Sequence, residues 1–166
     1  MGIRPKIEAA LSATADRLHP GSGANAVRHA KNDLGTIDAT SEDFNRRYAD
    51  EAVKIAAPAI VEAKQPDGDP VTIKKKHAGL IVVFSDSFIF VRAMGFGFRE
   101  VKALRTSEVS VERVATVVDG TEIPGLKITG RAGKPKLALA IAQAKEPGNP
   151  AEQAAVRDEI YALLAT

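Results

Sequence analysis

The side chains of this sequence with the clearest capacity for binding chemistry are basic. They fall in two short stretches, one rich in lysine before a histidine and one in a later glycine-containing turn. Grouped cations of this kind attract phosphate groups or an acidic protein surface. Short lysine runs also keep edge strands from pairing with other chains, so the alternative interpretation is that these cations are solvated edge and turn residues. The candidate partner-binding cations are Lys74, Lys75, Lys76, Arg131, Lys134 and Lys136.

A second candidate for partner binding is Phe96, which stands between Gly95 and Gly97. The flanking glycines permit a tight connection and leave the ring few neighbours to pack against. An aromatic side chain held on a short loop loses little entropy on contact and can anchor a partner protein or a lipid interface. The alternative is that Phe96 folds back over the open end of a sheet and completes the core.

No catalytic constellation is present in the sequence. There is no cysteine, so thiolate chemistry and disulfides are excluded, and the three histidines are scattered without a second ligand at metal-binding spacing. The stretch Gly21-Ser22-Gly23-Ala24-Asn25-Ala26 superficially matches a dinucleotide-binding loop, but it follows a predicted helix rather than a strand. We therefore predict no catalytic residue, no metal site and no cofactor.

The overall charge of +2 is nearly balanced, but the two parts of the chain differ. Residues 1–69 carry 9 basic and 11 acidic side chains, whereas residues 70–166 carry 14 and 10. An anionic partner should therefore prefer the C-terminal part. Aromatic residues make up only 5% of the chain, which argues against nucleic-acid binding. The sequence shows neither a secretion signal nor an apolar run of about 20 residues, so we expect a cytoplasmic protein.

The first third of the chain has helical patterns. Helices are predicted over residues 5–18 and 24–34, with Gly35 just past the second. A third begins at Thr40 and carries an apolar stripe as far as Ala59, with Pro58 kinking or ending it. The turn-forming residues 65–70, "QPDGDP", then mark a boundary. This pattern predicts an N-terminal helical segment over 1–69 and a second domain over 70–166.

The second part of the chain reads as strands followed by one helix. Asn149-Pro150 is a helix start, and the helix it opens should bury Val156, Ile160, Leu163 and Leu164. Such an α+β chain can close a curved antiparallel sheet with one helix, so we predict that residues 71–166 fold by themselves. The predicted strands are residues 80–84, 88–91, 98–104, 109–118, 123–130 and 137–141.

The stretch "GLIVVFSDSFIFVRAMGFGFREVKALRTSEVSVERV", followed by "GLKITGRAGKPKLALAI" and a terminal helix, resembles the bacterial pleckstrin-homology-like (PH-like) domains. The resemblance covers about residues 77–166. It implies a strongly bent, partly open barrel capped by the C-terminal helix, and residues 1–70, with their predicted helices, fall outside it. The family often has Thr-Asp-Arg-Arg in the first hairpin turn, where this chain has Ser85-Asp86-Ser87. Without those arginines, the turn is a poor site for an inositol lipid.

Three functions follow from these observations. We expect a non-enzymatic binding module that recognises a protein partner or a second copy of itself, through a sheet edge or a groove beside the C-terminal helix. The second hypothesis is attachment to an anionic membrane surface through Lys74 to Lys76 and Phe96. The third is an enzyme whose site lies between the helices and the sheet, which would require a deep polar pocket.

Overall fold

The computed structural model describes residues 3–40, 48, 50–74, 77–95, 98–143 and 148–165, and of 38–40, 94–95 and 98–99 it describes the backbone alone. The predicted α+β class is confirmed. The helices are α1 (Arg4–Leu18), α2 (Gly23–His29), α3 (Lys31–Thr40) and α5 (Pro150–Leu164), with a 3-10 turn at Thr106–Glu108. The strands are β1 (Ile55–Glu62), β2 (Val71–Thr72), β3 (His77–Val83), β4 (Ser87–Gly95), β5 (Phe98–Arg105), β6 (Val109–Val118), β7 (Thr121–Gly130) and β8 (Lys136–Ala140).

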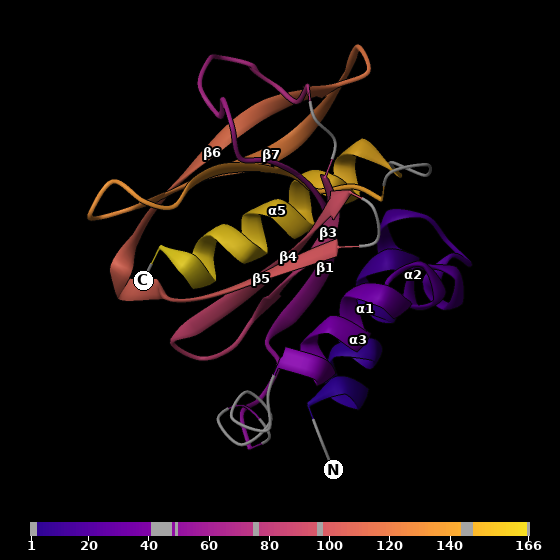
Figure 1. The fold of residues 1–166 in the computed structure, drawn as a ribbon. Helices are drawn as coiled ribbons and strands as arrows, with labels where there is room; N and C mark the ends of the chain where they lie inside the picture. The colour runs from indigo at the N-terminus through magenta and orange to yellow at the C-terminus, as the bar shows by residue number, and fades with distance from the viewer. Residues whose placement is uncertain are drawn as a thin grey trace.

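The eight strands form one curled sheet in the order β2-β6-β7-β8-β1-β3-β4-β5. The six predicted strands are confirmed as β3 to β8, and their neighbours pair antiparallel. One pair differs from the predicted antiparallel sheet, because β2 runs parallel to β6. Figure 1 shows α5 inside the curl, between β6 and β7 on one side and β3, β4 and β5 on the other.

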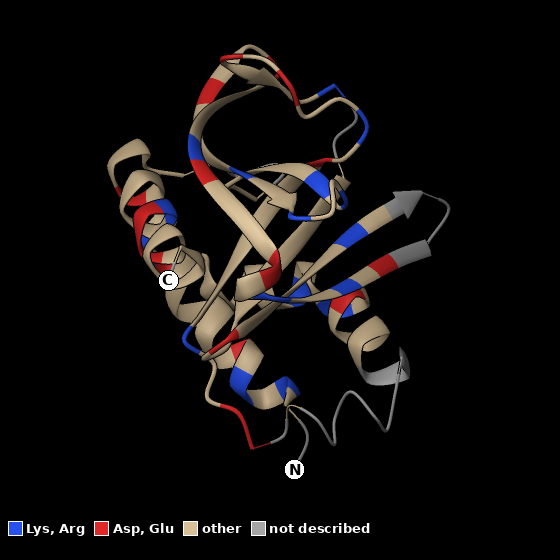
Figure 2. Cartoon of the chain, turned by 90° about the vertical axis from the view of Figure 1, so that its left-hand side faces the viewer, with Lys and Arg blue, Asp and Glu red and all other residues tan. Residues whose placement is uncertain are grey.

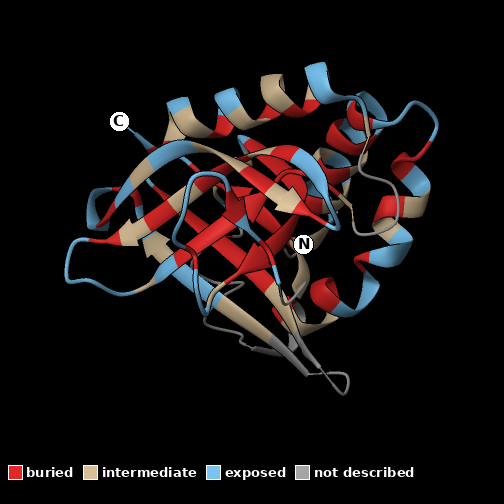
Figure 3. Cartoon of the chain, turned by 90° about the horizontal axis from the view of Figure 1, so that it is seen from above, coloured by how far each residue is buried: buried red, intermediate tan, exposed pale blue. Residues whose placement is uncertain are grey.

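Two apolar cores lie on opposite faces of the same strands. Ile81 and Phe88 belong to the core that contains α5, whereas Leu80 and Ile89 belong to a second core with α1 and α3. The helices α1 to α3 cover the outer side of this half of the sheet (Figure 1). Figure 3 shows the buried residues running along the central strands. Covering on both faces explains why these strands read as nearly continuous apolar runs.

The prediction of a helix reaching Ala59 is wrong, because residues Ile55–Glu62 form β1. This strand pairs with β3 along its length and with β8 from Ile60 onward, and all eight of its residues are buried. A strand buried on both faces has no alternation, so a run of alanines with isoleucine fits a helical stripe equally well. Pro58 lies in the part of β1 where the described ladders give the strand one partner, β3. A proline, which has no N–H to donate, is tolerated at such a position.

The position of β1 affects the predicted division of the chain. A cut at residues 69 and 70 leaves β1 on the N-terminal side, although this strand joins the two halves of the sheet. The helix predicted over 24–34 is in fact two helices, α2 and α3, and Gly35 lies inside α3 rather than past its end. The third helix was predicted to begin at Thr40, and its next residues, 41–47, lie outside the described part of the chain.

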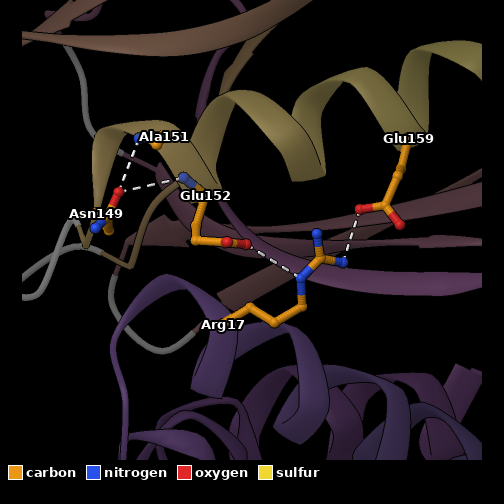
Figure 4. A network of polar contacts seen from close by, with 5 residues as sticks. All are labelled: Arg17, Asn149, Ala151, Glu152 and Glu159. Carbon is orange, nitrogen blue, oxygen red and sulfur yellow. Dashed lines mark hydrogen bonds and ion pairs between the residues drawn. The ribbon is translucent and has the colours of Figure 1, made fainter.

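The helix α5 begins as predicted and is tied to the end of α1 (Figure 4). The Asn149 side chain accepts hydrogen bonds from the backbone N–H groups of Ala151 and Glu152, at 2.8 and 3.3 Å. Arg17 of α1 forms ion pairs with Glu152 at 3.3 Å and Glu159 at 2.7 Å, and the Glu159 hydrogen bond raises the pKa of Arg17. The N-terminal helices are thus joined to α5 as well as to the sheet.

Candidate partner-binding groove

The strand β6 has an open edge beside α5. Its partner β2 pairs only with Thr116 and Val117, and along residues 109–115 the described ladders give β6 a partner on the β7 side alone. The backbone N–H of Ile73 donates to the Val117 carbonyl at 2.9 Å, so the main-chain groups of Val117 face this edge. Since main-chain direction alternates along a strand, the groups of Ala115 and Arg113 face the same way. Among the described residues these main-chain groups have no backbone partner, so they can act as donors and acceptors for an added strand.

A groove lies where the chain preceding β2 diverges from this edge. Going backward from β2, Gly68 and Asp69 run beside β6 without extending the parallel ladder beyond Val71. The groove has a volume of about 520 Å³. We call it the β6 groove; it is lined by Gly68, Asp69, Glu112, Arg113, Val114, Ala115, Lys127 and Arg157.

The α5 side of the β6 groove carries an arginine pair that shares one carboxylate. Asp158 lies 2.7 Å from the Nε atom of Arg157 and 3.7 Å from the Nη1 atom of Arg113. The guanidinium of Arg113 also lies over the ring of Tyr161, at 4.6 Å from its centroid. These contacts connect β6 to α5 and hold both arginines at the side of the groove.

The opposite side of the groove is also held by paired charges. Asp67, one residue before Gly68, contacts the Nζ atoms of Lys127 at 3.5 Å and Lys136 at 2.6 Å. The hydrogen bond from Lys136, aided by both lysine charges, lowers the pKa of Asp67 below its usual range. Figure 2 shows basic and acidic residues interspersed over this part of the sheet rather than gathered by sign.

The buried carboxylate of Glu62 anchors the segment that forms one wall of the groove. Glu62 is 2% exposed and ends β1. Its Oε1 atom accepts from the backbone N–H groups of Lys64 and Gln65, at 2.8 and 3.2 Å, and its Oε2 atom accepts from that of Lys74 at 3.1 Å. The segment that connects β1 to β3 is therefore held near both of its ends, at residues 64–65 and at residue 74, by the same side chain.

This arrangement suits an extended polypeptide better than a polyanion. A polypeptide can use the outward main-chain groups of β6 and continue the ladder in line with β2. Its charged side chains of either sign would meet opposite charges, since Arg113, Arg157 and Lys127 line the groove together with Asp69 and Glu112. The charged, alternating sequence of β6 is typical of an edge strand and was the signal available for finding this site. The wall formed by residues 68 and 69 was not foreseeable, because those residues were predicted only as a boundary.

The predicted site residues come from separate places. Lys74 is exposed and follows β2, while Arg131 and Lys134 are exposed in the turn between β7 and β8. Lys136 is the first residue of β8, and its side chain forms an ion pair with Asp67 at the border of the groove. Lys75, Lys76 and Phe96 lie outside the described residues, so their role as binding residues stays a prediction.

Comparison of the sequence with models of protein families and with curated proteins finds no match. In the part of the chain that the structure describes, no helix combines the length and the apolar character needed to cross a bilayer.

Proposed function

We propose that this chain is a non-enzymatic, protein-binding module on a PH-like scaffold, and that it binds an extended segment of a partner protein by strand addition to β6. The scaffold part of the proposal is supported by the curled sheet with α5 seated inside it. The observation that carries the binding mode is the open main-chain edge at Arg113 to Ala115, bordered by the β6 groove.

Charge pairing favours a protein partner over an anionic membrane surface. The cations closest to the β6 groove, Lys127, Lys136, Arg113 and Arg157, each contact Asp67 or Asp158. Pairing with a carboxylate reduces the net positive charge that these cations can offer to an anionic lipid surface. The main-chain groups of the edge carry no net charge, so hydrogen bonds to them are much less sensitive to salt than charge attraction is.

The test uses two baits that differ at one main-chain N–H. Ala115→Pro removes a donor that faces away from β7, so the β6–β7 ladder stays intact. Ala115→Val keeps the donor and is the matched control. Each full-length variant is immobilised and exposed to native lysate, and the captured proteins are quantified by mass spectrometry.

We expect at least one protein to be retained by Ala115→Val in about 0.5 M salt and to bind Ala115→Pro about tenfold more weakly. Equal capture by the two baits would contradict strand addition at β6. Loss of all capture at this salt concentration, together with binding of both variants to anionic vesicles, would favour membrane attachment instead.

A further inference from the structure

A cavity of about 200 Å³ lies between the N-terminal helices and the strands β1 and β3. We call it the interlayer cavity. For comparison, an engineered apolar cavity of about 150 Å³ stays dry and binds benzene. The interlayer cavity is therefore large enough for a ligand of about one six-membered ring.

Small residues on both layers leave this space open. Ala26 and Ala30 line the cavity from the helical layer, and Ala59 of β1 lines it from the sheet. Gly79 of β3 also lines it, and a Cβ atom built there would overlap the Val91 carbonyl oxygen of β4. Because a side chain at residue 79 would collide with β4, the sheet wall of the cavity cannot be filled from this position.

The lining gives a charged ligand little to pair with. Apart from His29, Asp33 and Gln143, all the described lining residues are nonpolar. None of these described residues is a lysine or an arginine, so an anion would meet neither of these side chains. The Asp33 carboxylate is buried and already interacts with another group of the protein, so a cation would have to compete with that group. Moving a charge from water into such surroundings is strongly unfavourable unless the charge is paired.

We propose that the interlayer cavity binds small neutral molecules with an apolar body of about one ring. The ring would lie between the small residues of the two layers, where apolar surface leaves water on binding. His29 lines the cavity and is exposed to solvent, so the ligand can enter beside it. The cavity shares no described lining residue with the β6 groove, so this proposal does not depend on strand addition.

Three probes with the same ring and different charge test the proposal: toluene, benzylamine and benzoate. Each is titrated into the isotope-labelled full-length chain while amide resonances are followed by NMR. We expect toluene to shift the amides of three lining residues, Ala26, Ala78 and Gly79, saturably. Toluene should also bind at least about tenfold more tightly than either charged probe, because neither charge gains a counter-charge in the cavity. No saturable shift at these amides, or a charged probe that binds as tightly as toluene, would overturn the proposal.

Variants that fill the cavity test its location. Ala26→Leu should abolish the saturable shifts, whereas Ala162→Leu, the same change at an exposed position of α5, should leave the affinity for toluene unchanged. Ala78→Val fills the cavity from the sheet with a residue that suits a strand, and it should weaken toluene binding at least about tenfold. Full toluene affinity in Ala26→Leu or in Ala78→Val would refute the assignment. If one of these variants does not fold, the other variant and the three probes on the unmodified chain decide.

Discussion

Replacing Glu62 by glutamine tests whether one buried carboxylate organises the excursion between β1 and β3. The two oxygen atoms of Glu62 accept three backbone N–H groups at distances between 2.8 and 3.2 Å. An amide keeps one of these acceptors and turns the other into a donor. In the better of the two orientations, the amide oxygen faces Lys64 and Gln65, and the NH₂ group faces the N–H of Lys74.

The magnitude follows from this geometry. A buried N–H left without an acceptor costs about 1–3 kcal/mol, and the two remaining hydrogen bonds lose their charge assistance. Glutamine also relieves the cost of burying a charge, which offsets part of the loss. We therefore expect Glu62→Gln to lower the free energy of unfolding by about 1–3 kcal/mol.

Urea denaturation measures this loss, with Glu122→Gln at an exposed site of β7 as the matched control. Glu122→Gln should change the free energy of unfolding by no more than about 0.5 kcal/mol. Hydrogen exchange adds a local readout, because the amides of Lys64, Gln65 and Lys74 should exchange faster in Glu62→Gln. Equal stability of the two variants, with unchanged exchange at these amides, would refute the role assigned to Glu62.

Three further predictions concern the core, the helical segment and acid stability. Ile160→Ala should lower the free energy of unfolding by about 2–5 kcal/mol, because Ile160 is fully buried. Leu163, predicted from the sequence to be buried, is only half-buried in the structure, so Leu163→Ala should lower the free energy of unfolding by less. Equal losses for the two variants in urea would argue against the docking of α5. The fragment 71–166 lacks β1 and α1 to α3, so, against the prediction from sequence, it should show no cooperative transition in calorimetry; a sharp transition would contradict this. Burial raises the pKa of Glu100, but the hydrogen bonds and charges of Arg92 and Lys102 together outweigh it and leave this pKa lowered. The resulting stabilisation is present above the unfolded pKa of about 4.3 and is lost as the pH falls through the folded pKa. Glu100→Gln should therefore lower stability at neutral pH and reduce its acid dependence, and an unchanged pH profile of the urea midpoint would contradict the assignment.

The strands that the sequence predicted well are those with clear local ends. Asp119 and Gly120, for example, adopt the positive φ values of a two-residue hairpin turn, and β6 and β7 pair on either side of them. The strand β1 was missed because its identity depends on being covered from both sides, which is a property of the assembled fold. Residues 55–62 contain no local signal that separates a buried strand from a helix, apart from Pro58.

The candidate groove was less predictable than the strands for a related reason. It depends on where residues 68 and 69 leave the edge of the sheet. Charge and residue type gave only part of the groove: Lys136 borders it, whereas Arg131 and Lys134 lie in a turn away from its lining. A sequence shows which residues are small or charged, but not which of them face one another.

The place of β1 between β8 and β3 also determines when the protein can fold during synthesis. Ile60 pairs with Ala140, and the concave face of the sheet is filled by α5, which follows all eight strands in the sequence. The half-sheet of β1, β3, β4 and β5 is synthesised before α5, so its α5-facing side remains uncovered until α5 has been made. Contacts this distant in sequence slow folding and lengthen the exposure of apolar surface. We therefore expect the nascent chain to aggregate more readily than the finished protein, and truncation within α5 to yield insoluble product.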